Sequence, residues 1–408
     1  MSRNKTITIF TGYYAPEDTA IGLYTSQFAL FLSKKGYSVS VITGFPYYPN
    51  WEILNEYKNK SSYFNEIIDG IKIFRYKQYV PKNVTFIGRI KLMTTHLWGS
   101  YINSRKIKET DLVICIVPPT LSIIAAAILV RKTKAKLWVH VQDFEFDLAF
   151  QSGILNEKIV GVFFKKLVFS LEKTLLKKAD IISAISLNMV KKTTEKTKKK
   201  EAYFFPNWVS LKNINPSIAK QHRYINKEKF TLLYSGNVGE KQNWALLELL
   251  AKKLMPFNVD IIVVGNGSYI EKLKHNLAPF DFVCFYEPIP YEGLNDLLCS
   301  ADVHFLFQKS GVMDTVMPSK ILGMMASGKP SIITGNEFSE VARIYNENNL
   351  EGFFCSDDID PILNFIKKIK TNKENAIPND LGSKEFVLEH FSEEKILQKF
   401  EEKIASIL

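Results

Sequence analysis

Cysteine is scarce in this chain. The 408 residues include only four, Cys115, Cys284, Cys299 and Cys355, and no two of them form a CxxC pair. This spacing argues against a disulfide framework and against a cysteine-bound zinc site. All but Cys355 lie in apolar runs, so we expect buried thiols in a reducing compartment.

Long hydrophobic segments are also lacking. The most apolar stretch covers residues 112–130, but Pro118 and Pro119 divide it into a strand-length piece and a helix-length piece. The first residues, MSRNKTITIFTG, run directly into a strand-like segment without the apolar stretch of a signal peptide. The sequence therefore predicts a cytoplasmic protein without a transmembrane helix.

The composition is that of a globular chain with a basic surplus. Hydrophobic residues make up 46% and charged residues 23%, which excludes a disordered or fibrous protein. Lys and Arg number 53 against 42 Asp and Glu, a net charge of +11. This surplus favours an anionic partner, and nucleic acid, an anionic membrane surface and a phosphorylated substrate all fit it.

Short apolar strands alternate with helical patterns along the chain, which is typical of parallel sheets buried on both faces. A polar, basic run at 191–200 (KKTTEKTKKK) interrupts the alternation, and we expect a domain boundary after it. The length itself suits two or three domains. Expected strands are 7–11, 38–43, 71–76, 112–116, 136–141, 180–184, 230–235, 259–264, 282–285, 303–307 and 330–333. Expected helices are 21–35, 87–106, 156–178, 244–254, 269–276, 294–300, 319–326, 361–370 and 392–408.

The predicted fold class is therefore α/β, with two Rossmann-like domains built on parallel sheets. The first domain covers residues 1–205 and the second covers 206–385. The remaining segment, 386–408, carries an amphipathic helix that we expect to pack back on the first domain.

Two glycine-bearing turns follow predicted strands, where ligands of open α/β sheets bind. Gly22 opens a helix after the first strand, and Gly265 and Gly267 follow the strand at 259–264. Glycine lets a backbone approach a ligand closely, and a helix N-terminus favours an anion. A plain strand-to-helix loop at Gly22 and a tight turn at Gly265 explain the two patterns as well.

Two further segments combine backbone amides with a lysine. In YSGNVGEKQN, Gly236 and Gly239 leave amides accessible and Lys241 stands at the start of the next helix, a combination that suits a diphosphate. In VMPSKILGMMASGKP, Ser319 and Lys320 begin a helix, which makes another anion site. Capping of that helix by Ser319 explains the second segment equally well.

An ordered set of motifs resembles the retaining family 4 glycosyltransferases of the two-domain GT-B fold. The motifs are GYYAPEDTAIG, ADIISAIS, FPNWV, LYSGNVGEKQN, VVGNG, ADVHFLFQKSG and MPSKILGMMASGKP, and they cover nearly the whole chain. QDFEFD and FQSG resemble the bacterial branch that assembles O-antigen, capsule and colanic acid, including L-fucosamine transferases.

The resemblance implies a nucleotide-sugar donor in a cleft between the two domains, held mainly by the second. Lys241 and Lys320 would stand on two sides of the diphosphate, with Glu287 and Pro288 near the base. The implied donor-binding residues are Gly22, Gly236, Asn237, Gly239, Lys241, Gly265, Glu287, Pro288, Ser319 and Lys320.

The candidate catalytic residues are Asp143, Lys241 and Lys320. The lysines would stabilise the leaving diphosphate, where charge develops in the transition state. Asp143 would orient the donor sugar or the acceptor hydroxyl, although a loop carboxylate or a helix cap fits the same position. His140 lies within an apolar strand, where a core role is commoner than a catalytic one.

The chain also departs from the family pattern. The positions of a glutamate pair found in many members fall on about Thr315 and Gly323, with Asp314 as the nearest acid. Asn237 stands where many members have an arginine. A His–Asp step of the family is the dipeptide QD here, with His140 two residues earlier. These departures leave the lysines as the main cations of the expected site.

The resemblance implies a retaining transfer of a sugar such as N-acetyl-L-fucosamine from a UDP-linked rather than a GDP-linked donor. The implied acceptor is an undecaprenyl-diphosphate-linked saccharide. We expect no cofactor and no metal ion, even at the acidic runs QDFEFD and SDDID. A nucleotide-sugar 2-epimerase of the same architecture is the alternative. A nucleic-acid binder ranks last, because the lysines follow helix faces and a linker rather than interleaving with aromatic residues on a sheet face.

Basic amphipathic segments suggest contact with an anionic membrane at the inner face of the plasma membrane. Residues 151–200 contain 12 lysines against 4 acidic residues, and Phe163, Leu167 and Leu171 recur there at helical spacing. Helices that cover the sheet and carry solvated lysines explain the same pattern.

Overall fold

A computed structural model gives the fold. It describes residues 4–17, 20–48, 50–82, 85–151, 157–198, 201–210, 212–311, 318–355, 358–377 and 382–408. The chain forms two compact units: the first is Met1–Pro206 with Leu397–Leu408, and the second is Asn207–Ile396. Residues 386–396 thus belong to the second unit, whereas the prediction from sequence placed them in the C-terminal segment that returns to the first domain.

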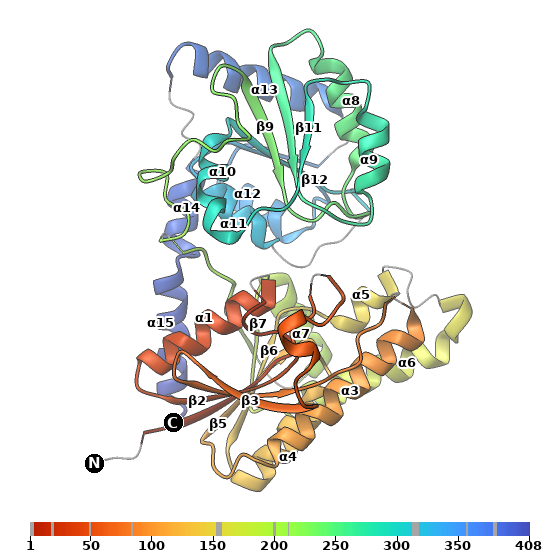
Figure 1. Cartoon of the computed structure of the whole chain (residues 1–408), viewed down its shortest axis with the longest axis vertical. Helices are drawn as coiled ribbons and strands as arrows, with labels where there is room; N and C mark the ends of the chain where they lie inside the picture. Colours follow the sequence, from red (N-terminus) through yellow and green to blue (C-terminus); the bar gives the residue numbers. More distant parts are fainter. Residues whose placement is uncertain are drawn as a thin grey trace. The chain divides into compact units, whose positions relative to one another are not determined.

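The first unit is built on an eight-stranded sheet of order β3-β4-β2-β1-β5-β6-β7-β8 (Figure 1). All neighbouring strands are parallel except β3 and β4. Helices lie on both sides of the sheet, so β5 is buried at every position. The strands are β1 (Thr6–Phe10), β2 (Ser38–Gly44), β3 (Tyr63–Ile68), β4 (Ile71–Tyr76), β5 (Leu112–Val117), β6 (Lys136–Val141), β7 (Ile181–Ala184) and β8 (Ala202–Phe204).

Strand β3 was not predicted. It is the edge strand of the sheet and its residues alternate between exposed and half-buried, so it lacks the apolar run of a buried strand. Asp69 and Gly70 join it to β4, both with positive φ (50° and 78°). An Asp–Gly pair with this geometry is the turn that two-residue hairpins favour. This pair was the feature of the sequence that could have predicted a hairpin of β3 and β4.

The helices of the first unit follow the predicted alternation, with one correction. The lysine run at 191–200 was expected to lead into a linker, but most of it belongs to α7. Lys196 forms ion pairs with Asp147, at 2.7 Å, and with Glu172, and these contacts hold the run against the unit. The helices are α1 (Ala20–Lys34), α2 (Asn55–Lys58), α3 (Phe86–Ser104), α4 (Ser122–Thr133), α5 (Glu145–Gln151), α6 (Glu157–Leu176) and α7 (Leu187–Thr197).

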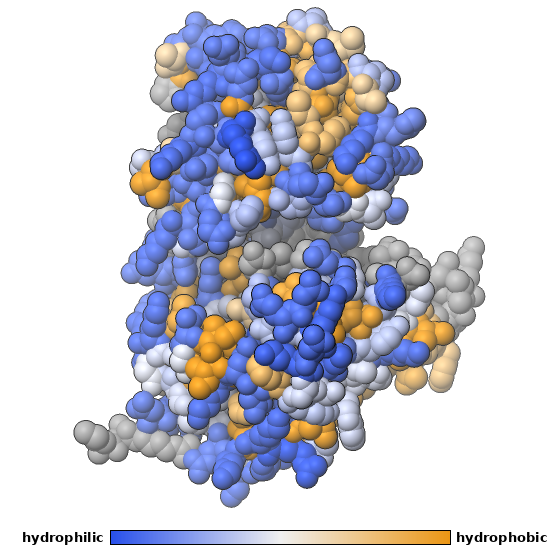
Figure 2. Space-filling model, viewed as in Figure 1, coloured by the Kyte–Doolittle hydropathy of each residue, from blue (hydrophilic) through white to orange (hydrophobic). Residues whose placement is uncertain are grey.

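Helices α3 and α6 carry large apolar side chains on their outer faces. Phe163 is 82% exposed and Trp98 is 62% exposed, and Val162 and Leu167 are also exposed. Apolar side chains lie among polar ones over this part of the first unit (Figure 2). No helix among the described residues has both the length and the hydrophobicity that crossing a bilayer requires.

The second unit is built on a six-stranded parallel sheet of order β11-β10-β9-β12-β13-β14. Helices again lie on both sides of it (Figure 1). The strands are β9 (Phe230–Ser235), β10 (Val259–Val264), β11 (Val283–Tyr286), β12 (Val303–Phe307), β13 (Ser331–Thr334) and β14 (Phe353–Phe354). The helices are α8 (Trp244–Leu254), α9 (Ile270–Leu277), α10 (Leu294–Ser300), α11 (Ser319–Ala326), α12 (Glu340–Glu347), α13 (Ile359–Glu374) and α14 (Ser383–His390), with a 3₁₀ turn at Tyr291–Gly293.

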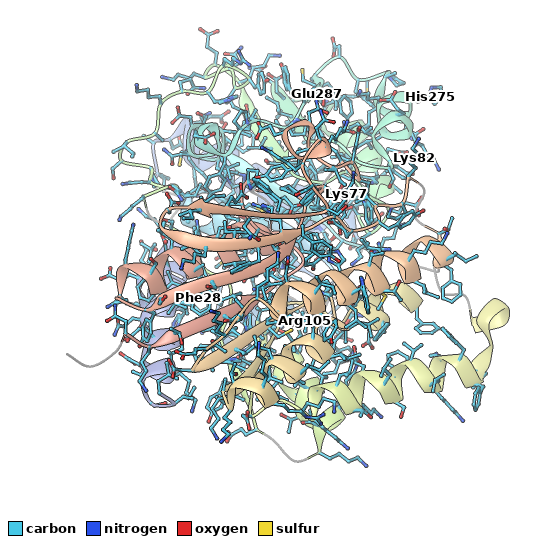
Figure 3. All side chains as sticks on the ribbon, turned by 60° about the horizontal axis from the view of Figure 1, so that its bottom comes forward. Phe28, Lys77, Lys82, Arg105, His275 and Glu287 are labelled. Carbon is cyan, nitrogen blue, oxygen red and sulfur yellow. The ribbon has the colours of Figure 1, made fainter. Side chains whose placement is uncertain are left out.

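The last helix is α15 (Glu393–Ala405). Its Phe400 ring contacts the rings of Phe205, Phe28 and Trp138, with centroids 4.2, 4.8 and 5.7 Å away. Phe28 comes from α1 (Figure 3). The C-terminal end of α15 thus packs into the core of the first unit.

The cysteines are only partly as expected. All four are free, and Cys115 is buried in β5. Cys284 and Cys299 are half-buried rather than buried. For Cys284 the reason is its place on β11, because β11 is an edge strand of the second sheet.

Candidate functional site

The strand order of the second sheet reverses between β9 and β12. These two strands are neighbours, with Leu232 opposite Val303, while β10 and β13 lie on opposite sides of them. Ligands of open parallel sheets bind outside the carboxyl ends of the strands at such a reversal. The turn at 236–241 follows β9, and α11, the helix after β12, begins with Ser319 and Lys320.

Lys320 lies against the turn that follows β9. Its Nζ donates a hydrogen bond to Tyr234 Oη at 2.9 Å and stands 4.3 Å from the centre of that ring. Tyr234 Oη in turn donates to the main-chain oxygen of Asn237 at 2.6 Å. A Cβ on Gly236 would lie 2.8 Å from Lys320 Nζ, so the ammonium stands directly over the glycine. The structure therefore brings Gly236, Asn237 and Lys320 together through Tyr234.

The ammonium of Lys320 lacks a carboxylate partner among the described residues, where the Tyr234 hydroxyl is its hydrogen-bond acceptor. Burial lowers the pKa of Lys320 from its ordinary 10.5 to about 8. A desolvated ammonium gains free energy from a nearby anion, because the anion restores the interaction that water had provided. The arrangement is therefore suited to a phosphate group.

Tyr234 was missed by the sequence reasoning. Its side chain is fully buried in β9, and burial raises the pKa of its hydroxyl, which stays neutral and can donate. A tyrosine near the end of a buried strand needs a hydrogen-bond partner for its hydroxyl. This requirement could have drawn attention to Tyr234 in the sequence, but it does not identify which lysine or carbonyl group is the hydrogen-bond partner.

Gly236 and Gly265 pack backbone against backbone at the ends of β9 and β10. The Gly236 amide donates to Val264 O at 2.9 Å, and a Cβ on Gly265 would stand only 1.9 Å from Gly236 O. Gly267 is similar, since its Cβ would lie 2.4 Å from Val238 O. The tight turn at Gly265 therefore has a packing reason of its own, and it fixes the position of the backbone under Lys320.

The other residues of the turn differ in their surroundings. The Gly239 amide donates to Gln242 Oε1 at 3.1 Å, and the Gly239 oxygen accepts from Trp244 Nε1 at 2.8 Å, so its main chain is already hydrogen-bonded within the turn. Asn237 and Lys241 are exposed. The main-chain oxygen of Lys241 accepts from the Lys309 amide at 3.1 Å, which ties this turn to the loop after β12.

Ser319, Glu287 and Pro288 are not in direct contact with this group. Ser319 is exposed, and the N-cap position of α11 is Pro318, so Ser319 does not cap the helix. Glu287, labelled in Figure 3, and Pro288 are exposed in the loop after β11, which is two strands away from β9 in the sheet. Asp314 and Thr315 lie outside the described residues.

In the first unit, Gly22 lies in the first turn of α1. A Cβ there would stand 2.7 Å from Glu17 O, so close packing of the helix on the preceding loop accounts for the glycine. Asp143 follows β6 and is half-buried, and its amide donates to Val117 O at 3.2 Å. The structure thus places Asp143 at the carboxyl edge of the first sheet.

His140 is a core residue. Its Nδ1 lies 2.8 Å from Ser183 Oγ and its Nε2 lies 3.2 Å from Gln142 Nε2, and its ring contacts Phe400. Burial lowers the pKa of His140 to about 3, so it is neutral at physiological pH. These contacts are those of a satisfied core histidine.

The acidic runs do not gather around one point. Glu145 Oε2 accepts from the Thr120 amide at 2.9 Å, while Asp147 pairs with Lys192 and Lys196. Asp358 caps α13 through the Asp360 amide at 3.1 Å. Within the described ranges, no three His, Cys, Asp or Glu side chains are placed to hold a metal ion.

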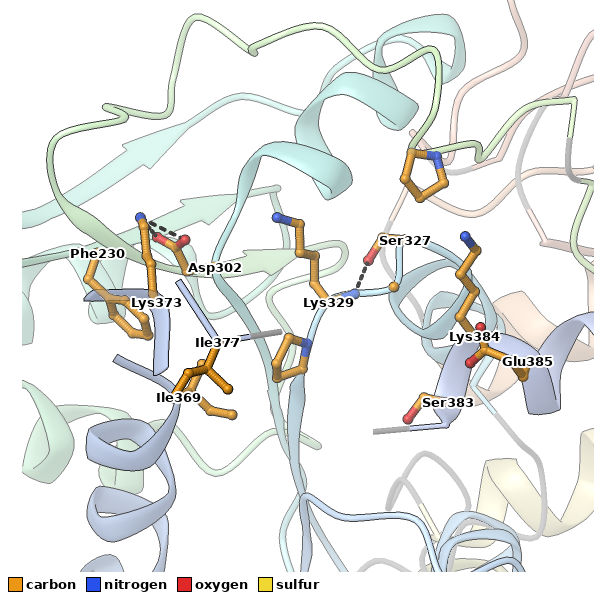
Figure 4. A pocket seen from close by; sticks show the side chains of 13 residues that line it. Phe230, Asp302, Ser327, Lys329, Ile369, Lys373, Ile377, Ser383, Lys384 and Glu385 are labelled. Atoms are coloured by element: carbon orange, nitrogen blue, oxygen red, sulfur yellow. Dashed lines mark hydrogen bonds and ion pairs between the residues drawn. The ribbon is translucent and has the colours of Figure 1, made fainter. Parts of the chain in front are cut away.

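A separate cavity of about 480 Å³ lies at the other edge of the second sheet (Figure 4). Phe230 begins β9 and Pro330 precedes β13, so the cavity faces the amino ends of these strands. Lys373 and Lys329 line it, and Lys373 pairs with Asp302 at 2.8 Å. None of the predicted donor residues line this cavity, and it lies away from the ligand edge of the sheet.

Comparison with solved structures shows the GT-B fold. The sucrose-phosphate synthase of Thermosynechococcus elongatus has a TM-score of 0.73 at 16% identity, with 99% of each chain covered. Anabaena HepE, solved with UDP and glucose, has a TM-score of 0.66 at 12% identity over 99% of this chain and 100% of that one. A structure from Listeria monocytogenes that is named as a UDP-N-acetylglucosamine 2-epimerase has a TM-score of 0.61 at 11% identity, over 99% of this chain and 96% of that one. A synthase and a protein named as an epimerase thus share this fold.

Two curated relatives are similar in sequence. A protein named as a colanic acid biosynthesis glycosyl transferase, WcaI of Escherichia coli K12, is 28% identical over 351 residues, which are 83% of this chain and 85% of the relative. A protein named as glycosyltransferase WbjE of Pseudomonas aeruginosa is 21% identical over 67% of this chain and 69% of its own. No protein-family model matches the chain. The fold is therefore GT-B, and the relatives support a glycosyltransferase family.

Proposed function

We propose that this protein transfers a sugar from a nucleoside-diphosphate donor during surface-polysaccharide biosynthesis. The observation that carries the proposal is the desolvated ammonium of Lys320 above the Gly236 backbone, at the strand reversal of the second sheet. A diphosphate there gains a cation and a helix N-terminus. The UDP complex of HepE, which shares the fold, supports a UDP-linked donor.

The chemistry required is stabilisation of the leaving diphosphate. Lys320 is held by Tyr234, so little reorganisation is needed when charge develops on the phosphate oxygens. Lys241, exposed at the end of the same turn, would approach the diphosphate from the β9 side. With lysines in this role, the proposed reaction is metal-independent. Asp143 remains our candidate for orienting the donor sugar or the acceptor hydroxyl.

The finer assignment follows the branch that the sequence resembles. The proposed reaction retains the anomeric configuration and transfers N-acetyl-L-fucosamine or a related sugar to an undecaprenyl-diphosphate-linked saccharide. The colanic acid relative supports the polysaccharide context. Since both curated relatives are named as transferases, transfer is favoured over 2-epimerisation.

A panel of nucleoside diphosphates tests the donor site. UDP at about 100 times its Kd should stabilise the protein by about 2.7 kcal/mol, and this is measured as a rise in Tm. GDP and inorganic phosphate at equal concentration are the controls. Equal rises in Tm with UDP and GDP would contradict the base preference. If none of the nucleotides raised the Tm, the proposed function would be contradicted.

Membrane contact is the second testable part of the proposal. On α6, Phe163 and Leu167 are exposed beside Lys165 and Lys166, a pattern that can lie in an anionic interface. We expect the protein to float with vesicles that contain phosphatidylglycerol and to be released as the salt concentration rises. The double variant Phe163→Ser, Leu167→Ser should lose this binding and keep its UDP-induced Tm shift. Equal flotation of the wild type with neutral vesicles would contradict the electrostatic part of the proposal.

A further inference from the structure

Arg89, in the first turn of α3, forms no ion pair with a described carboxylate, although its charge acts against the rise that burial causes in the pKa of Glu145. Its Nε is buried and has no hydrogen-bond acceptor among the described residues. The guanidinium lies 4.9 Å from the centre of the Trp51 ring. The Arg89 side chain is half-buried, and burial of its Nε without an acceptor costs free energy. An anion at this point would therefore gain the charge of Arg89 and a hydrogen bond from Nε.

Aromatic rings surround this guanidinium. Tyr13 stacks on Tyr47, with centroids 5.7 Å apart, and makes edge contact with Tyr48 at 5.9 Å. Tyr48 is 37% exposed and lies 6.4 Å from Trp51, again edge-on. Burial raises the pKa of all three tyrosines and the charge of Arg89 acts against that rise, which shows how close the cation is. Flat apolar faces around one cation form a typical ligand site.

The loops that carry these rings are held in place by Glu17. Its carboxylate accepts from the Tyr47 and Tyr48 amides, both at 2.8 Å, which ties the loop after β2 to the loop after β1. Trp51 has a φ of 55°, a left-handed conformation that is uncommon for tryptophan. The strand order of the first sheet reverses between β1 and β5, so these loops lie at its ligand edge.

The same helix also presents apolar side chains to solvent. Ile87 is 64% exposed and Ile90 is 38% exposed, on either side of Arg89 in the sequence. The rings of Phe86 and Phe164 are in contact, with centroids 5.6 Å apart, so the first turn of α3 adjoins α6 and its exposed apolar face. A cation beside exposed apolar side chains matches an amphiphile with an anionic head group.

We infer that Arg89 binds the diphosphate of a lipid-linked acceptor, with the Trp51 and Tyr48 rings beside the head group and the lipid chain along the exposed apolar side chains of α3 and α6. The planar guanidinium can hold two phosphate oxygens through two parallel N–H donors, a fixed geometry that the ammonium of a lysine does not offer. The inference rests on the proposed function, since it names the acceptor of that reaction.

Farnesyl diphosphate is a soluble probe for this site. The titration is made by calorimetry on the full chain with UDP at saturation, so that the Lys320 site is already occupied. We expect Arg89→Gln to weaken farnesyl diphosphate binding by roughly 10- to 100-fold, as for the loss of charged hydrogen bonds. Arg89→Lys should restore only part of the affinity. Arg105→Gln, at the exposed far end of α3, is the matched control and should bind like the wild type (Figure 3).

The arms of the experiment separate the possible failures. Inorganic diphosphate and farnesol are titrated in parallel, and both should bind more weakly than farnesyl diphosphate. Inorganic diphosphate binding as tightly as its farnesyl ester would overturn the lipid part of the inference. Equal binding by the wild type and Arg89→Gln would overturn the role of Arg89. UDP binding is recorded separately for the wild type and for each variant. Failure of the wild type to bind UDP would count against the proposed function, whereas a wild type that binds UDP leaves the farnesyl diphosphate titrations as the test of Arg89.

Discussion

Replacing Lys320 by Met is expected to lower the turnover of sugar transfer by about 10²–10³-fold, the typical cost of removing one preorganised donor from a developing charge. Stability should not fall, because the substitution removes an ammonium that burial disfavours, as its lowered pKa of about 8 indicates. Turnover is measured as release of the nucleoside diphosphate with acceptor present, and stability as Tm without ligand.

Lys329→Met is the matched control, since Lys329 follows α11 at its other end and lines the cavity at the amino ends of the strands. It should retain the turnover of the wild type. If Lys320→Met kept full turnover, or if both variants lost it equally, Lys320 would have no specific role in the reaction.

The lowered pKa also gives this prediction a pH signature. Below about pH 8, Lys320 is already protonated in the free protein, whereas above it a bound diphosphate must draw in a proton. UDP affinity should therefore fall as the pH rises from 8 toward 10, by up to about tenfold per pH unit. The nucleotide phosphates do not contribute to this fall, because they are fully ionised over the whole range. In Lys320→Met the affinity should be lower and flat with pH.

Unfolding does not explain such a fall. Between pH 8 and the ordinary lysine pKa of 10.5, the unfolded chain binds more protons at Lys320 than the folded chain does. The contribution of this residue to stability therefore rises with pH over the same window in which binding weakens.

The fold was largely predictable because its central strands are continuous apolar runs. β5, β10 and β12 are buried at every position, and their β-branched and aromatic residues indicate parallel strands directly. Strand β3 was not predictable on this basis, because an edge strand with one solvated face has no such run. Helix α7 was mistaken for the start of a linker, because a run of lysines is typical of a solvent-exposed segment. The partners of Lys196, Asp147 and Glu172, are distant in the sequence, so the ion pairs that hold α7 could not be predicted.

The candidate site was predictable only to the level of segments. Glycine turns and the start of α11 could be located from sequence, since each follows a strand. The link from Lys320 through Tyr234 to the Asn237 carbonyl depends on side chains 86 residues apart, which no local pattern specifies. Arg89 could not be singled out from the sequence, because the lack of an acceptor for its Nε is a property of the folded loops around it.

Replacing Gly265 by Ala should damage the same site through the backbone. The new Cβ would need to occupy a position 1.9 Å from Gly236 O, and the atom it meets is backbone, which cannot rotate away as a side chain can. The turns after β9 and β10 must therefore separate, at a cost of about 1–3 kcal/mol in the free energy of unfolding. Because Lys320 Nζ stands over Gly236, the separation should also weaken UDP binding. Chemical denaturation and a UDP titration measure the two effects.

Gly311→Ala provides the matched control, since Gly311 is an exposed glycine after β12 and a Cβ there meets nothing within 4 Å. It should change neither quantity. A Gly265→Ala protein that is less stable but binds UDP as the wild type does would mean that the contact between the two turns serves the fold alone. Lys320 would then act without the support of the β10 turn. Loss of both stability and binding, together with an intact Gly311→Ala protein, is the expected result, because the carbonyl that the new methyl group would strike belongs to the residue beneath the ammonium.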